Sequence, residues 1–238
     1  MTVAPIGWAR DHERVAAGLI LLAVLALWFW PLALGEQMGQ SHVLWFDHPW
    51  RADRPQDPEL IPRSGEGDAA VVFHPILEVA RAQVHAGRLP LWNPYIYAGM
   101  PLLGDVQSAL LYPLTWLAMV LPVESAWGLM AVLKLLIAGL GAFVLGRELG
   151  LGRPGALVAG VVFMLCSPNV AWLQWPLATV YALLPWLLYA THRLHARPSR
   201  RRAAALAGVV ALSLFAGHPE TAALSSTAAG VYLVALGE

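Results

Sequence analysis

The chain has 238 residues, of which 58% are hydrophobic and 13% are charged, and its mean hydropathy is +0.58. Soluble globular proteins carry about 25% charged residues, so this composition argues against an ordinary soluble domain. The formal net charge is zero, so nothing indicates a nucleic acid partner, and the single cysteine excludes an intrachain disulfide and a cysteine-based metal site. Long continuous apolar runs and 11 tryptophans predict an all-α, multi-pass membrane protein; a transmembrane barrel would alternate apolar and polar residues.

The first predicted span is the apolar run at residues 15–34. This run is long enough to cross the hydrocarbon core of a bilayer, and it lacks the small-residue cleavage site of a secretory signal. Arg10 and Arg14 precede it, so the positive-inside rule places the N-terminus in the cytoplasm.

Residues 35–125 are predicted to form one large extracytoplasmic loop. Its first half is rich in proline and shows no periodicity, which predicts irregular chain. The apolar face of residues 75–86, followed by Gly87, predicts a short amphipathic helix that lies in the membrane interface. The run at residues 109–122 has only 14 residues and contains Pro113, which favours a re-entrant or interfacial segment over a full span.

Five later apolar runs are predicted to span the membrane, at residues 126–146, 155–170, 177–191, 203–216 and 221–236. If residues 109–122 do not cross, Arg147, Arg153 and the basic cluster at 193–202 fall in the cytoplasm, as the positive-inside rule requires. If that segment crosses, both groups fall outside. We therefore expect six spans.

This topology brings three polar regions to the external face of the membrane. They are the loop at residues 35–125, the turn at residues 167–175 and the turn at residues 217–220. Because they are far apart in the sequence, their convergence predicts a site on that face.

The stretch at residues 87–113 is too broken by proline and glycine to form a regular helix or strand. It carries aromatic rings that include Trp92 and Tyr95, and the amides of Asn93 and Gln107. This mixture suits a shaped surface at a membrane–water boundary, where amphipathic rings and a few polar groups can face a ligand. The alternative is that the rings only anchor the loop at the interface.

The string PLWNPYIYAGMPLLGDVQSALLYP, followed by RELGLGRPGALVAG and later by AGHPET, resembles the YfhO-like bacterial membrane proteins of the GT-C glycosyltransferase superfamily. The resemblance covers roughly residues 65–225. It implies a GT-C-like helical bundle whose first external loop carries interfacial helices and an essential acidic residue, and a polyprenyl-phosphate-linked sugar as donor. Such proteins are usually longer, so we expect this chain to be an N-terminal fragment. The paired-acid motif of several such families is missing, which leaves the need for a divalent cation, Mg²⁺ or Mn²⁺, open.

Sugar transfer from a lipid phosphate needs a base that takes the acceptor's proton and cations that hold the leaving phosphate. Asp68, which precedes the interfacial helix, is the first candidate base; the alternative is a carboxylate placed there by the helix dipole. Asp105 is the second candidate, and it could equally be a helix N-cap.

Two cations are candidates for the phosphate. Lys134 is the only lysine and lies inside a predicted span, where a charged side chain indicates function, although it could also extend towards the interface. Arg88 lies at the external interface and could instead be a plain surface charge. His218 and Glu220 are supporting polar groups of the third external turn, or simply solvated residues.

The leading prediction is therefore a membrane glycosyltransferase that acts on the external face with a polyprenyl-phosphate sugar, surrounded by membrane lipid. A transporter or flippase of lipid-linked glycans is the first alternative. It predicts ionisable residues along a path through the spans, whereas only Lys134 clearly lies within one. A non-catalytic membrane scaffold is the second alternative.

Overall fold

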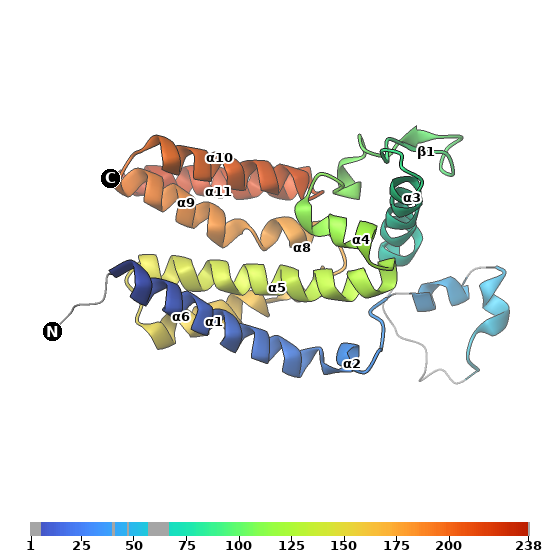
Figure 1. The fold of residues 1–238 in the computed structure, drawn as a ribbon, viewed down its shortest axis with the longest axis horizontal. Helices are drawn as coiled ribbons and strands as arrows, with labels where there is room; N and C mark the ends of the chain where they lie inside the picture. Colours follow the sequence, from blue (N-terminus) through green and yellow to red (C-terminus); the bar gives the residue numbers. More distant parts are fainter. Residues whose placement is uncertain (1–5, 40, 47, 57–66, 238) are drawn as a thin grey trace. The chain divides into compact units, whose positions relative to one another are not determined.

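The computed structural model describes residues 6–39, 41–46, 48–56 and 67–237, and it is mainly helical (Figure 1). The chain divides into two compact units. The helical unit comprises residues 1–34 and 131–238, and the loop unit comprises residues 35–130. Residues 57–66, in the proline-rich half of the predicted loop, lie outside the described residues.

In the helical unit, successive long helices run antiparallel to one another (Figure 1). Helix α5 begins in the loop unit and continues into the helical unit. The bounds are α1 (Ile6–Trp28), α2 (Trp30–Ala33), α5 (Val123–Glu148), α6 (Arg153–Met164), α7 (Ser167–Ala171), α8 (Pro176–Tyr181), α9 (Leu184–Ala196), α10 (Arg200–Phe215) and α11 (Pro219–Ala235).

Three of the predicted spans are interrupted in the structure, each near a proline. The run at 155–170 breaks between α6 and α7, and the run at 177–191 breaks between α8 and α9. Pro168 and Pro185 have no N–H for the carbonyl four residues earlier, and those carbonyls belong to the last residues of α6 and α8. Within the run at 15–34, the break falls at Phe29, between the end of α1 and the start of α2, and Pro31 is the second residue of α2. Apolar composition alone therefore concealed these breaks.

Among the described residues, α5 is the one helix that is both long and apolar enough to cross a membrane. Helix α6 is apolar but shorter. The six-span topology therefore stays a prediction.

The core of the helical unit brings helix backbones into close contact. A Cβ atom built on Gly160 of α6 would lie 2.9 Å from the carbonyl oxygen of Gly139 on α5, and 3.5 Å from Leu21 of α1. Ala17, Phe143, Val144 and Ala156 form a buried cluster at the same three helices. Small residues at helix contacts allow this approach, as in other membrane proteins.

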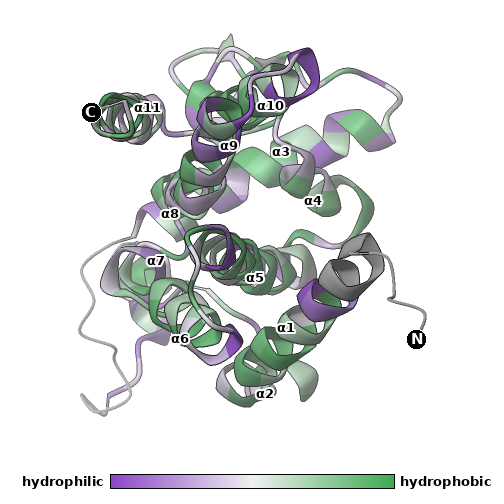
Figure 2. Cartoon of the chain, turned by 90° about the vertical axis from the view of Figure 1, so that its left-hand side faces the viewer, coloured by the Kyte–Doolittle hydropathy of each residue, from purple (hydrophilic) through white to green (hydrophobic). Residues whose placement is uncertain are grey.

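Ion pairs join the N-terminal part of α1 to the C-terminal end of α5. Arg147 donates a hydrogen bond to the Glu13 carboxylate, and the Arg153 guanidinium lies 3.5 Å from the same carboxylate. Arg193 of α9 lies 3.2 Å from Glu148. Figure 2 looks at this end of the helices and shows hydrophilic stretches on α1, α9 and α10. The predicted cytoplasmic arginines of this unit thus meet at one end of it.

The ion pair of Glu13 predicts a pH-dependent contribution to stability. Glu13 precedes the predicted span, and the hydrogen bond from Arg147 lowers the pKa of its carboxyl below the ordinary value of 4.5. A lowered pKa means that the contribution is present above the pKa of the unfolded chain and is lost as the pH falls through the folded pKa. We expect Glu13→Gln to cost about 0.2–1 kcal/mol at pH 7 and progressively less as the pH falls through the folded pKa, measured by thermal unfolding in detergent. The exposed Glu36→Gln is the control, and a cost of Glu13→Gln that stays constant with pH would contradict the assignment.

The loop unit is built around α3 (His74–His85), within one residue of the predicted interfacial helix. A π-helical turn, η4 (Ala69–Phe73), leads into it. The other elements are η1 (Ser41–Phe46), η2 (Trp50–Asp53), β1 (Trp92–Asn93), β2 (Met100–Pro101), η5 (Val106–Ser108), η6 (Pro113–Trp116) and α4 (Leu117–Val120). Residues 109–122 thus contain only short turns, and no helix long enough to cross a membrane.

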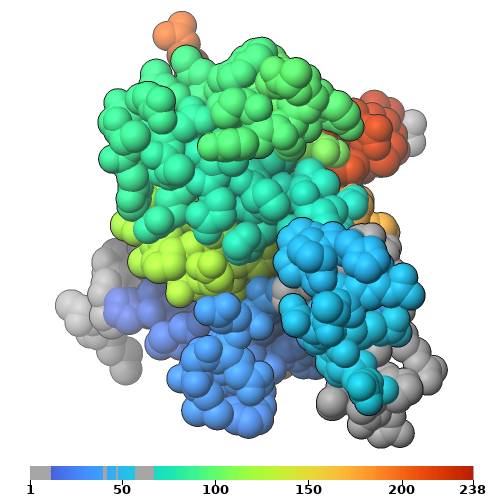
Figure 3. Space-filling model, turned by 90° about the vertical axis from the view of Figure 1, so that its right-hand side faces the viewer, coloured from blue at the N-terminus to red at the C-terminus, as the bar shows by residue number. Residues whose placement is uncertain are grey.

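Helix α3 is held against α4 by its apolar face and by two side-chain hydrogen bonds. Ile76, Leu77 and Ala80 are buried. Arg81 donates to the Leu121 carbonyl oxygen at 3.0 Å, and His85 Nε2 lies 2.9 Å from the Met119 carbonyl oxygen. Figure 3 shows the residues from α3 to the β1–β2 turn, in teal to green, as one continuous surface. The loop is therefore a folded unit with its own core.

Candidate functional site

Three side chains of the loop unit come together where α3 begins. They are His74 and Glu78, one turn apart on α3, and Glu124 in the first turn of α5; their ligand atoms all lie within 4.8 Å of one another. Residues four apart share a helix face, and a carboxylate is favoured near a helix N-terminus. The His74 ring packs against Trp127, with 5.8 Å between ring centroids, which fixes its orientation. We call these three residues the acid–histidine trio.

The donor set of the trio fits a divalent transition metal. Ligands about 2.0–2.2 Å from a metal lie about 3–4 Å apart, so small side-chain rotations would bring all three onto one ion. One imidazole and two carboxylates suit Mn²⁺ or Zn²⁺ better than Mg²⁺, which prefers oxygen ligands and keeps its waters. The sequence did not decide whether a divalent cation is needed. The trio is the part of the loop that could hold one.

Asp68 lies close to the trio along the chain. It immediately precedes η4, six residues before His74, and is half-buried. Its side chain makes no capping hydrogen bond to the turn it precedes. Its place directly before a helical turn is also compatible with the alternative, a carboxylate favoured there by the helix dipole.

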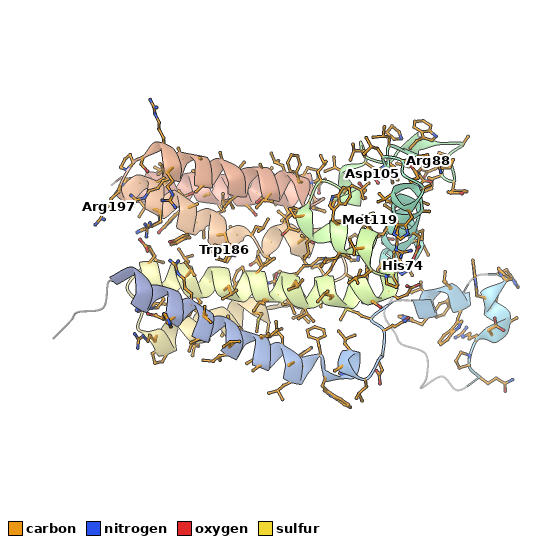
Figure 4. All side chains as sticks on the ribbon, in the orientation of Figure 1. His74, Arg88, Asp105, Met119, Trp186 and Arg197 are labelled. Atoms are coloured by element: carbon orange, nitrogen blue, oxygen red, sulfur yellow. The ribbon has the colours of Figure 1, made fainter. Side chains whose placement is uncertain are left out.

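Asp105 occupies the alternative role that the sequence left open. Its Oδ1 accepts a hydrogen bond from the Gln107 backbone N–H at 3.2 Å, which makes it the N-cap of η5. Figure 4 places Asp105 and Arg88 towards one end of α3 and His74 at the other. Asp105 therefore lies apart from His74 of the trio. Arg88 and Gln107 are both exposed.

The turn between β1 and β2 gives the aromatic stretch its shape. Trp92 pairs with Pro101 and Asn93 with Met100 in the two strands. Asn93 is buried, and its Oδ1 accepts from the Tyr95 backbone N–H at 3.0 Å, so this amide shapes the turn. The Trp92 and Tyr95 rings are 51% and 81% exposed, which leaves both free to contact a ligand or the lipid interface.

Tyr112 differs from the other rings of the stretch because it belongs to the core of the loop unit. It is 5% exposed, and burial raises the pKa of its hydroxyl to about 12. Although Tyr112 belongs to the aromatic stretch at residues 87–113, its ring is not accessible to a sugar.

Gly99 is predicted to be essential for this turn. Its φ is +118°, and a Cβ there would lie 2.6 Å from the Trp92 ring. We expect Gly99→Ala to cost about 1–3 kcal/mol of local stability and to expose the stretch to limited proteolysis. Gly87→Ala is the matched control, because Gly87 has a φ of +70° but open space around it. Equal cleavage rates in the two variants would show that the close packing of the Trp92 ring against Gly99 does not stabilise the turn.

In the helical unit, Lys134 contacts the segment after α7. Its Nζ donates to the carbonyl oxygens of Leu173 and Trp175, at 3.2 and 3.5 Å. These bonds satisfy carbonyls that no longer belong to a helix, which gives Lys134 a structural role inside α5. One donor of the ammonium group is left for another partner.

Asn169 of α7 is a buried polar residue that sequence reasoning missed. It is 1% exposed, its Nδ2 donates to the Phe163 carbonyl oxygen at 2.7 Å, and its Oδ1 accepts no hydrogen bond from the described residues. The sequence gives one indication of this residue's burial, namely that it is a polar residue within an apolar run, directly after Ser167 and Pro168.

His218 is the N-cap of α11, which explains its place in the turn. Its Nδ1 accepts from the Thr221 backbone N–H at 3.3 Å and lies 2.9 Å from the Thr221 hydroxyl. Glu220 is exposed in the first turn, where the helix dipole favours a carboxylate. The two therefore have local structural roles.

The predicted site residues thus fall into separate groups. Asp68 leads into the acid–histidine trio, Asp105 and Arg88 lie towards the other end of α3, and Lys134 is engaged with backbone carbonyls. Sequence reasoning missed the trio as a group, because Glu124 lies 46 residues after Glu78 and only folding joins them.

The apolar composition, the mainly helical structure and the spanning length of α5 define a helical membrane protein. A family model described as "6-pyruvoyl-tetrahydropterin synthase related domain; membrane protein" matches residues 111–237, just over half of the chain. The chain belongs to this family of membrane proteins. No curated protein and no solved structure matches it.

Proposed function

We propose that this protein is a GT-C-like membrane glycosyltransferase of the bacterial inner membrane that transfers a sugar from a polyprenyl-phosphate donor at the external face. The acid–histidine trio is the observation that carries the proposal. It gathers two carboxylates and an imidazole in a folded loop that the positive-inside rule assigns to the outside. The likeness of the 87–113 stretch to YfhO-like proteins supports the same function.

Asp68 is the favoured base in this proposal. Its carboxylate precedes the trio and makes no capping hydrogen bond, and in this proposal it accepts a proton from the acceptor hydroxyl. The acceptor oxygen then forms a bond to the anomeric carbon of the sugar as the bond from that carbon to the phosphate oxygen breaks. Asp105 is the second candidate for this role.

The trio would hold a divalent cation in this reaction. When bound, such a cation neutralises charge on the leaving phosphate. The exposed guanidinium of Arg88 could bind the same charge, and Trp92 and Tyr95 present exposed rings for the sugar or prenyl chain.

Sugar transfer by trio variants tests the proposal. Membranes that contain the full-length protein would receive labelled polyprenyl-phosphate sugars with Mn²⁺. We expect Glu78→Gln and Glu124→Gln to lower transfer at least tenfold, because each removes a charged ligand, and chelation to lower it in the wild type. Glu36→Gln, an exposed carboxylate of the same unit, is the control and should transfer normally. Equal transfer by all variants would overturn the role of the trio.

A further inference from the structure

A second candidate site lies between α9 and α10, apart from the residues of the proposed reaction. A cavity of about 760 Å³ opens there. Four arginines line one end, namely Arg193, Arg197, Arg201 and Arg202. Along the two helices away from them, the lining becomes apolar, with Trp186, Ala205 and Val209. Figure 4 shows Trp186 and Arg197 at separate points along this part of the chain. We call this cavity the arginine pocket.

The charge in the arginine pocket is mostly uncompensated. Arg193 pairs with Glu148 at 3.2 Å and lies over the Tyr189 ring. Arg202 donates to the Arg197 carbonyl oxygen, which neutralises no charge. Arg197 and Arg201 are exposed and have no carboxylate partner among the described residues, and no acidic side chain of the described chain lines the cavity. The pocket therefore favours an anion.

The wall of the pocket is fixed before any ligand binds. Trp186 Nε1 donates to the Ile137 carbonyl oxygen at 2.8 Å, and the Trp186 and Tyr189 rings meet edge to face at 6.5 Å. Ser199 accepts from the Arg202 backbone N–H at 3.3 Å and caps α10. Side chains that are already ordered lose little conformational entropy when a ligand binds.

A cavity that is cationic at one end and apolar at the other fits an amphiphile. We propose that the arginine pocket binds an anionic membrane phospholipid, with the phosphate among the arginines and an acyl chain along Trp186, Ala205 and Val209. Guanidinium groups bind phosphate oxygens in pairs, and basic pockets between membrane helices on the cytoplasmic side suit such head groups. This inference is independent of the proposed sugar transfer.

Binding of defined lipids to the purified full-length protein in neutral detergent tests the proposal. We expect phosphatidylglycerol to bind at least tenfold more tightly than phosphatidylcholine with the same chains. Glycerol 3-phosphate, which has the charge but no chain, should bind far more weakly. Equal binding of glycerol 3-phosphate would show that the ligand is a free phosphate and would overturn the lipid assignment.

Two matched variants test the location. We expect Arg197→Gln/Arg201→Gln to weaken phosphatidylglycerol binding about twenty-five-fold, at about fivefold per arginine near a membrane surface. Arg51→Gln/Arg200→Gln removes the same charge from exposed residues that do not line the pocket, and should change binding less than twofold. Equal weakening by both pairs of substitutions would mean that the lipid is attracted by the overall charge of the protein. It would overturn the assignment of the arginine pocket as the binding site.

A third variant tests the apolar end without changing charge. Ala205 is exposed in the lining, so Ala205→Trp should fill the cavity and leave the helix core intact. We expect it to weaken phosphatidylglycerol about tenfold and to leave glycerol 3-phosphate unchanged. Unchanged lipid binding would contradict the placement of the acyl chain along Ala205.

Discussion

Replacing Asp68 by asparagine is expected to lower sugar transfer about 10²–10⁴-fold, because the amide keeps the size of the carboxylate but cannot accept the acceptor's proton. The structure supports this choice of residue in two ways. Asp68 precedes the helix that carries His74 and Glu78, and its side chain makes no capping bond that the substitution would disturb. The measurement is the initial rate of transfer from a labelled polyprenyl-phosphate sugar, normalised to protein in the membrane.

Asp105→Asn is the matched comparison for Asp68→Asn. An asparagine at position 105 can still accept the hydrogen bond from the Gln107 N–H, so we expect transfer to stay within about tenfold of the wild type. If Asp105→Asn abolished transfer and Asp68→Asn did not, Asp105 would be the base and its capping bond would be a way of orienting it. Normal transfer by both variants would contradict acid–base catalysis by either residue.

Gly160→Leu is expected to destabilise the helical unit by about 3 kcal/mol, because a Cβ at this position already lies 2.9 Å from the Gly139 carbonyl oxygen. The backbone of α5 cannot rotate away as a flexible side chain would. A leucine must therefore push α5 and α6 apart and open the buried cluster that Phe143 of α5 and Ala156 of α6 form with Ala17 of α1. The measurement is thermal unfolding in detergent.

Gly208→Leu separates this packing effect from any general effect of the side chain. Gly208 lies within α10, with nothing within 4 Å of a Cβ built on it. Leucine has the better helix propensity, so this variant should be as stable as the wild type or more stable by up to about 1 kcal/mol. Equal destabilisation by both substitutions would show that the close contact of α5 and α6 does not hold the unit together.

Composition and periodicity predicted much of the fold. The prediction of a helical membrane protein is confirmed by the family match and the helical structure. The amphipathic face and Gly87 located α3 to within one residue, because capping and periodicity are local properties. The helix breaks near Pro168 and Pro185 were missed, since apolar runs on both sides conceal the loss of a backbone hydrogen bond.

The candidate site was harder to predict because it depends on contacts distant in sequence. Neither the neighbours of His74 in the sequence nor a motif pointed to Glu124. Asn93 was predicted to bind the substrate, whereas its burial and its hydrogen bond from the Tyr95 N–H give it a role in shaping the turn. The arginine pocket likewise requires the packing of α9 against α10, where the sequence shows only a basic cluster.

Reconstitution of the purified full-length protein in liposomes tests the central claim most directly. Labelled polyprenyl-phosphate sugar and an acceptor would be supplied with Mn²⁺, and both sugar transfer and movement of the donor between leaflets would be measured. We predict sugar transfer that depends on the protein and is lost in Asp68→Asn. Movement of the donor without transfer would contradict the enzyme assignment and support a flippase.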